Sequence, residues 1–163
     1  MALTERERLF LENAVELMGL AEAAAEALRY SFAHRPELTL ERDASRTDAE
    51  WERWDALTVR FARLADVLTQ QVFRAIDMAE FLPADSTFVD RINRAEKRGH
   101  IQSAYVWKEI RDIRNQIVHE YASAQLQLLF QDVVRLAPEL LACVERLSFY
   151  KAALRQQLAN DPA

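Results

Sequence analysis

Apolar residues recur along this chain every three or four positions, the spacing that places them on one face of an α-helix. The clearest run follows Thr47 and Glu50, whose T-x-x-E spacing is typical of a capped helix start. Its apolar members are Trp54, Leu57, Phe61, Leu64, Leu68 and Ile76. We expect this helix to stop before Pro83, because proline lacks the amide hydrogen that a helix interior needs.

An earlier helix is predicted from Thr4 and Glu7, which repeat the capping spacing, to about Tyr30. Its expected apolar stripe consists of Leu9, Phe10, Leu17, Leu20, Ala24 and Leu28. Residues 31–46 contain a proline and many charged residues, so we predict a loop there.

A short third helix is expected after Asp85 or Ser86, either of which can cap it, and it should end at Gly99. Glycine suits the position after a helix because it adopts positive φ at no steric cost. A fourth helix is then predicted over residues 102–121.

A fifth helix should begin near Ser123, and Pro138 either bends it or begins a separate helix. The last residues, 159–163, should fray. The chain is therefore predicted to form a single all-α domain over residues 1–163. The expected architecture is an up-and-down bundle of four or five helices.

The composition agrees with an all-α fold and also indicates which cellular compartment we expect for the protein. The 163 residues are 50% hydrophobic and include only 2 Gly and 4 Pro, so few turns are expected. The single cysteine, Cys143, excludes an internal disulfide. No apolar run reaches transmembrane length, and the N-terminus is charged from position 5. We therefore expect a cytoplasmic protein without a signal peptide or a membrane span.

Charge is distributed unevenly along the chain. The net charge of -5 argues against a general nucleic-acid binder. Residues 91–114, however, carry seven Lys and Arg against three acidic residues, so this segment has a charge of +4. Such a segment either steers a phosphate to one place or is a solvated helix face. The candidate RNA contacts in it are Lys97, Arg98, Trp107 and Lys108.

The fourth helix carries the polar residues of greatest interest. At about 100° per residue, its core face consists of Val106, Ile110, Ile113 and Ile117. Relative to Val106, Arg114 and Tyr121 lie at about 60–80° and border this face. Asn115 and His119, at about 180° and 220°, should point away from it, so burial does not explain the histidine.

These side chains suit phosphodiester cleavage in RNA. His119 can take a proton from a 2′-hydroxyl or give one to the leaving 5′-oxygen, and Asn115 can hydrogen-bond its ring and fix the tautomer. Arg114 can stabilise the negative phosphorane, supported by Arg111 on the same stripe as Asn115. Because one helix offers one histidine, two copies meeting at a two-fold axis would supply a complete site.

Other chemistries find no support in the sequence. It contains no H-E-x-x-H sequence, no paired cysteines and no glycine-rich phosphate loop. The three histidines, His34, His100 and His119, are too scattered to indicate a metal site. We therefore expect neither a metal nor a cofactor.

Residues 114–121, with the pattern R-N-x-x-x-H-x-Y, resemble the signature of HEPN domains. The resemblance is to the HepT-like toxins and the related nucleotidyltransferase substrate-binding proteins. Gly99 and Trp107 in the run into the motif are also similar to that family, so the motif region is residues 100–122 and the resemblance is clearest over 50–150. In the earlier helix, Asp55-Ala56 and Arg60-Phe61 match faintly, whereas Ala62 stands where the family would have an acidic residue.

The resemblance implies a homodimer that cleaves RNA without a metal, in a cleft between the motif helices. Arg114 and His119 would then be catalytic, Asn115 would orient the site, and Tyr121 would line it. The implied partner is a minimal nucleotidyltransferase that acts as antitoxin and attaches AMP to Tyr121. The added bulk and negative charge would exclude RNA from a cationic cleft.

Three functions remain open on the sequence alone. The first is an endoribonuclease toxin, and the second is a non-catalytic subunit that holds a nucleotide or substrate for a nucleotidyltransferase. The third is a structural helical dimer in which the motif is a coincidence, so that changing Arg114 would affect stability and nothing else. Cleavage of RNA separates the first from the other two.

Overall fold

The computed structural model describes residues 2–38, 46–83, 85–119 and 123–162. Every regular element in these ranges is helical. The elements are α1 (Glu5–Ala33), α2 (Asp48–Asp66), the π-helical segment η2 (Val67–Val72), α3 (Phe73–Ala79), α4 (Phe88–Lys97), α5 (Ala104–His119) and α6 (Ser123–Ala159). The predicted all-α bundle is therefore confirmed.

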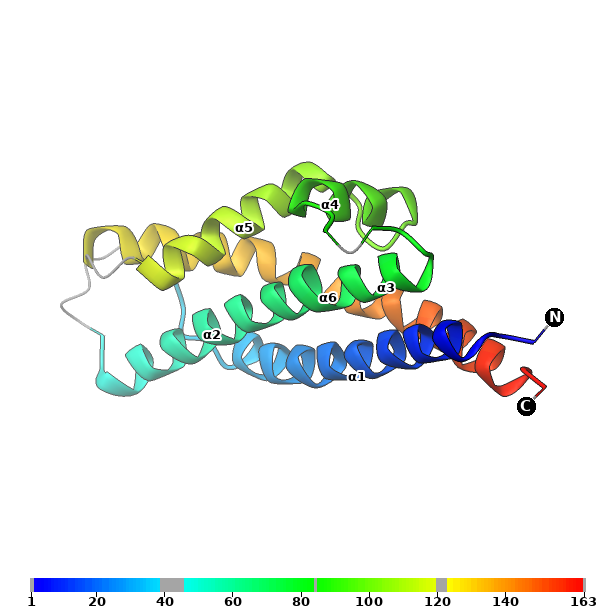
Figure 1. The fold of residues 1–163 in the computed structure, drawn as a ribbon. Coiled ribbons are helices and arrows are strands. Elements are labelled where there is room, and N and C mark those ends of the chain that lie inside the picture. The colour runs from blue at the N-terminus through cyan, green and yellow to red at the C-terminus, as the bar shows by residue number, and fades with distance from the viewer. Residues whose placement is uncertain (1, 39–45, 84, 120–122, 163) are drawn as a thin grey trace.

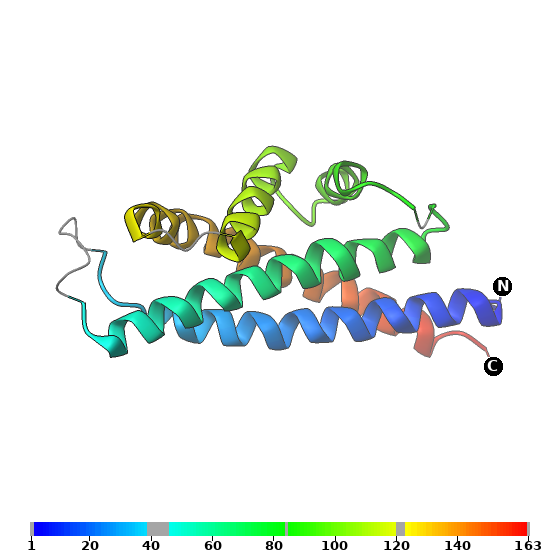
Figure 2. The same cartoon turned by 60° about the vertical axis from the view of Figure 1, so that its left-hand side comes forward.

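Three long rods form the body of the bundle. The segments α2, η2 and α3 follow one another as one rod, which packs against α1, and α1 packs in turn against α6 (Figure 1). The shorter helices α4 and α5 lie together on one side of this rod, and Figure 2 shows α4 crossing it at a steep angle. None of the described helices combines the length and the apolar character needed to cross a membrane.

The predicted capped starts of the first two long helices are confirmed. The Thr4 hydroxyl accepts the Glu7 amide hydrogen at 3.2 Å, and the Glu7 carboxylate accepts the Thr4 amide hydrogen. Thr47 and Glu50 form the same reciprocal pair. Each pair satisfies amide groups that a helix start leaves without partners.

The third helix begins slightly later than predicted. Its cap is Thr87 and not Asp85 or Ser86, because Asp90 stands three residues after Thr87 and closes a reciprocal pair with it. The end of this helix agrees with the prediction, since Gly99 has a φ of +75°. Lys97 is the last helical residue.

A π-helical turn interrupts the central rod, which the sequence pattern did not indicate. The Phe73 amide bonds to the Leu68 carbonyl, five residues earlier. The Thr69 hydroxyl donates to the Ala65 carbonyl at 2.8 Å, and the Arg91 Nε donates to the Thr69 carbonyl at 3.0 Å. Side chains thus satisfy carbonyl groups in and beside the widened turn.

The buried core follows the predicted stripe closely in α2 and less closely in α1. All six predicted residues of the central rod are fully buried, and Trp54 stacks on Phe130 with ring centroids 4.5 Å apart. In α1, Leu28 is buried as expected, but Leu9 and Leu20 are exposed. The stripe that α1 does bury is Leu11, Ala14, Met18, Ala21, Ala25 and Leu28. Its small alanines allow close approach to the neighbouring helices.

The C-terminal helix α6 shows that Pro138 does not begin a separate helix, and its end corrects the expectation that residues 159–163 fray. Pro138 lies inside α6, which continues through it as one helix. The tail does not fray at Asp161, whose carboxylate accepts the Leu3 amide hydrogen at 2.8 Å and pairs with Arg8. The two ends of the chain are therefore tied together, as their positions in Figure 1 show.

Candidate functional site

A polar cleft lies where α5 faces the end of α2 and the π-helical segment. It is open to solvent and has a volume of about 320 Å³. Its polar lining consists of Asp66, Thr69, Gln70, Gln71, Arg111, Arg114 and Asn115. The cleft therefore joins three of the predicted site residues to a segment that the sequence analysis did not single out.

Arg114 is held in this cleft by a carboxylate from α2. Its Nη2 donates to Asp66 Oδ2 at 2.8 Å, and its Nε lies 2.7 Å from Asp66 Oδ1. Its Nη1 donates to the Asn115 side-chain oxygen at 3.2 Å. Hydrogen bonding to Asp66 raises the pKa of Arg114, so the guanidinium is a fixed charge in a fixed place.

Asp66 is the site residue that sequence reasoning missed. An acidic residue was expected at position 62, but Ala62 is buried there. Asp66 stands four residues later, which is about one helical turn, and so points from nearly the same side of α2. Asp66 therefore brings a carboxylate to the cleft from a position one turn after Ala62.

The predicted hydrogen bond between Asn115 and His119 is not observed among the described residues. His119 is the last residue of α5 and is exposed, in agreement with the outward position expected for it. Asn115 is half-buried, and its side-chain oxygen accepts from Arg114. Within the described chain, no hydrogen bond joins Asn115 to the His119 ring, so the expected fixing of the tautomer is not observed. Tyr121 lies outside the described residues.

Arg111 reaches the cleft from the turn before Arg114. Its guanidinium carbon lies 4.7 Å from the centre of the Phe88 ring, a cation–π contact that supports the side chain from α4. The residue is otherwise exposed. Arg111 thus lines the cleft one turn before Asn115, and its supporting role stays a prediction.

Trp107, a candidate RNA contact, is buried completely. Its ring packs against Phe73 at 5.3 Å, and its Nε1 donates to Glu139 at 3.2 Å. The helical wheel misplaced it because α5 crosses the bundle, and its first turns are buried on a different side from its last turns. The expectation that Trp107 contacts RNA is wrong for this structure.

The basic candidates differ in how accessible they are. Lys97 and Lys108 are exposed. Arg98 instead pairs with Asp77 at 2.9 Å and with Glu80 at 2.6 Å. None of the three lines the cleft. Arg94 also pairs with Asp77, at 2.8 Å, so part of the positive charge of residues 91–114 is neutralised by acidic residues of the same chain.

Comparison with known protein families gives one match. The sequence model of the ribonuclease HepT-like family matches residues 22–147, which is well over half of the chain. No curated protein matched, and neither did any solved structure. The matched range includes α2, the π-helical segment and α5, and so contains both walls of the cleft.

Proposed function

Because the chain belongs to the ribonuclease HepT-like family, we propose that it is a metal-independent endoribonuclease with Arg114 and His119 as its catalytic residues. The observation that carries the proposal is the placement of Arg114. A carboxylate and an amide fix its charge at the mouth of an open cleft, and the same helix presents an exposed histidine.

In the proposed reaction, two copies of the chain place two histidines and two arginines around one phosphate. One His119 removes the proton from the ribose 2′-hydroxyl as the 2′-oxygen bonds to phosphorus. The other His119 protonates the 5′-oxygen as its bond to phosphorus breaks. The products are a 2′,3′-cyclic phosphate and a 5′-hydroxyl, and Arg114 neutralises the charge that builds up on the phosphorane.

We further propose that the protein acts as a toxin whose partner is a small nucleotidyltransferase. Adenylylation of Tyr121 would place a negative phosphate two residues from His119. That charge would occupy the arginines that the substrate needs. Mass spectrometry of the protein expressed with and without its partner would detect the added AMP.

The decisive experiment is RNA cleavage in excess EDTA by purified wild type, His119→Ala and Arg114→Ala. Loss of the histidine should lower the rate by about 10²- to 10⁴-fold, and loss of the arginine by about 10²- to 10³-fold. Arg155→Gln removes a charge near the C-terminal end of α6, away from the cleft, and is the matched control. A His119→Ala protein that cuts as fast as wild type would show the proposal to be wrong.

The second function, a subunit that holds a nucleotide without cleaving it, also draws on a specific observation. The cleft beside Arg114 lies within one chain and is large enough for part of a nucleotide. This function predicts nucleotide binding by wild type with no cleavage at any pH from about 5 to 8, where a histidine would titrate.

A further inference from the structure

The amide of Gln70 is oriented by a buried arginine. The Arg91 Nη2 donates to the Gln70 side-chain oxygen at 3.3 Å. A guanidinium has no acceptor, so the amide oxygen must face it and the two amide hydrogens point elsewhere. Arg91 is itself anchored by the carbonyl groups of Thr69 and Ser86, so this orientation is built into the fold.

Asn115 offers donors to the cleft as well. The oxygen of Asn115 is occupied by Arg114, which leaves the amide hydrogens of Asn115 for another partner. Asp66, the one carboxylate in the lining, is engaged by Arg114. A ligand that contacts Gln70, Arg111 and Asn115 must therefore supply acceptors.

The cleft also carries an uncompensated positive charge. Its lining contains the two guanidiniums of Arg111 and Arg114 against the one carboxylate of Asp66. No carboxylate of the described residues pairs with Arg111, which rests on the ring of Phe88. One negative charge would complete the balance.

We propose that this cleft binds a backbone phosphate of the RNA next to the scissile one, with Arg111 and Gln70 as its ligands. The inference rests on the proposed function, since it names a second contact of the same substrate. A phosphodiester carries one negative charge and offers only acceptors, as Arg111 and the Gln70 amide require. The edges of the nucleobases, in contrast, present donors as well as acceptors.

The test measures binding of short 2′-O-methyl RNA oligonucleotides, which cannot be cleaved, to wild type, Arg111→Gln, Gln70→Glu and Arg155→Gln. A neutral methylphosphonate replaces one phosphate at a time along the oligonucleotide. We expect one position beside the cleavage site at which this replacement weakens binding to wild type about tenfold. The same replacement should have almost no effect in Arg111→Gln, because the two changes remove one interaction.

Gln70→Glu and Arg155→Gln provide two further comparisons. Gln70→Glu should weaken binding of the natural oligonucleotide but not of the methylphosphonate one, because the new carboxylate repels only the charged form. Arg155→Gln should keep the full methylphosphonate effect. The salt dependence of binding should fall by about 0.7 in logarithmic slope in Arg111→Gln, the contribution of one phosphate contact to a single strand.

The two proposals fail in different ways. If no methylphosphonate position couples to Arg111, or if an abasic substitution couples in its place, the phosphate site is wrong even when the protein cleaves RNA. If the coupling is found but wild type never cleaves RNA, the phosphate site stands and the proposed ribonuclease activity falls.

Discussion

At the scale of single residues, Asp66 decides how Arg114 can act. Both carboxylate oxygens of Asp66 face the Arg114 guanidinium. Arg114 can therefore present only the opposite edge of its guanidinium to a phosphate. This arrangement preorganises a positive charge and leaves little freedom to lose when substrate binds. Asp66 is therefore a positioning residue in the proposed site.

We predict that Asp66→Ala lowers kcat by about ten- to a hundredfold, because small misplacements of a catalytic group are costly. Affinity for a non-cleavable oligonucleotide should change much less, since the positive charge of Arg114 remains. Asp66→Asn keeps one acceptor oxygen and should recover part of the rate. Equal rates in Asp66→Ala and wild type would contradict this role.

The sequence indicated Arg114, Asn115 and His119 but not Asp66, for a physical reason. The first three lie on one helix, and their relative directions follow from helical geometry. The contact between Asp66 and Arg114 joins residues 48 positions apart and depends on how α2 and α5 pack. Periodicity carries no information about such a contact.

The buried histidine His100 should make the free energy of unfolding depend on pH. Burial of its ring, together with the nearby Arg98, lowers its pKa to about 4, whereas an unfolded chain would bind the proton near pH 6.5. Between these values the unfolded state holds more protons, so the free energy of unfolding should fall as the pH drops from 7 toward 4.

The His100 contribution to this loss should be about 2 kcal/mol by pH 4.5. Urea unfolding of wild type and His100→Gln at pH 7 and pH 4.5 measures it. Carboxylates titrate in both proteins, so the difference between them isolates the histidine. The same loss of stability in both would mean that His100 does not titrate abnormally.

At the scale of elements, the capping sequences predicted the starts of the first two long helices, and the apolar spacing predicted the buried stripe of the central rod. The π-helical segment was not predictable, because the apolar pattern of the central rod continues through it. Part of its support comes from outside the rod, since the Arg91 side chain on α4 donates to the Thr69 carbonyl. The segment also turns Gln70 toward the cleft, which links this irregularity to the proposed site.

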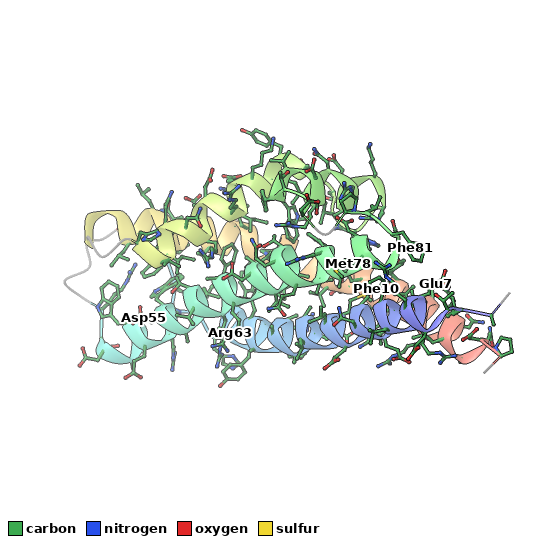
Figure 3. All side chains as sticks on the ribbon, in the orientation of Figure 1. Glu7, Phe10, Asp55, Arg63, Met78 and Phe81 are labelled. Carbon is green, nitrogen blue, oxygen red and sulfur yellow. The ribbon has the colours of Figure 1, made fainter. Side chains whose placement is uncertain are left out.

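Phe81 ends the central rod in a conformation that normally favours glycine. Its φ is +59°, and the Leu82 amide bonds back to the Asp77 carbonyl at 2.9 Å, as in a helix end closed by glycine. The side chain is exposed and lies at the same end of the molecule as Phe10 and Met78 (Figure 3). A bulky residue in this region of φ costs about 1 kcal/mol or more.

We therefore predict that Phe81→Gly raises the free energy of unfolding by about 1 kcal/mol. Phe81→Ala is the matched control, because it removes the ring and keeps the strained backbone. It should be no more stable than wild type. Denaturant unfolding of the three proteins tests the prediction, and a gain in the alanine variant equal to that in the glycine variant would show that the ring causes the strain.

At the scale of the whole molecule, one chain places Arg114 in the cleft and His119 outside it. The cleft lining includes Arg114 but not His119, which is exposed at the end of α5. Five residues along a helix separate two side chains by about 140° and 7.5 Å. The proposed reaction needs an acid and a base, so in that reaction a second copy would have to complete the site.

This requirement predicts how wild type behaves when mixed with an inactive variant. If two His119 side chains serve one site, a dimer with one His119→Ala chain is inactive. Random pairing of equal amounts then leaves about a quarter of the wild-type activity per chain. Independent chains would retain about half.

The two proteins should be unfolded and refolded together before RNA cleavage is measured, so that the chains exchange. Arg155→Gln, mixed in the same way, should leave the activity unchanged and so shows that refolding itself causes no loss. A residual activity of about half would mean that each chain carries a complete site, and the pairing of histidines in the proposed reaction would have to be abandoned.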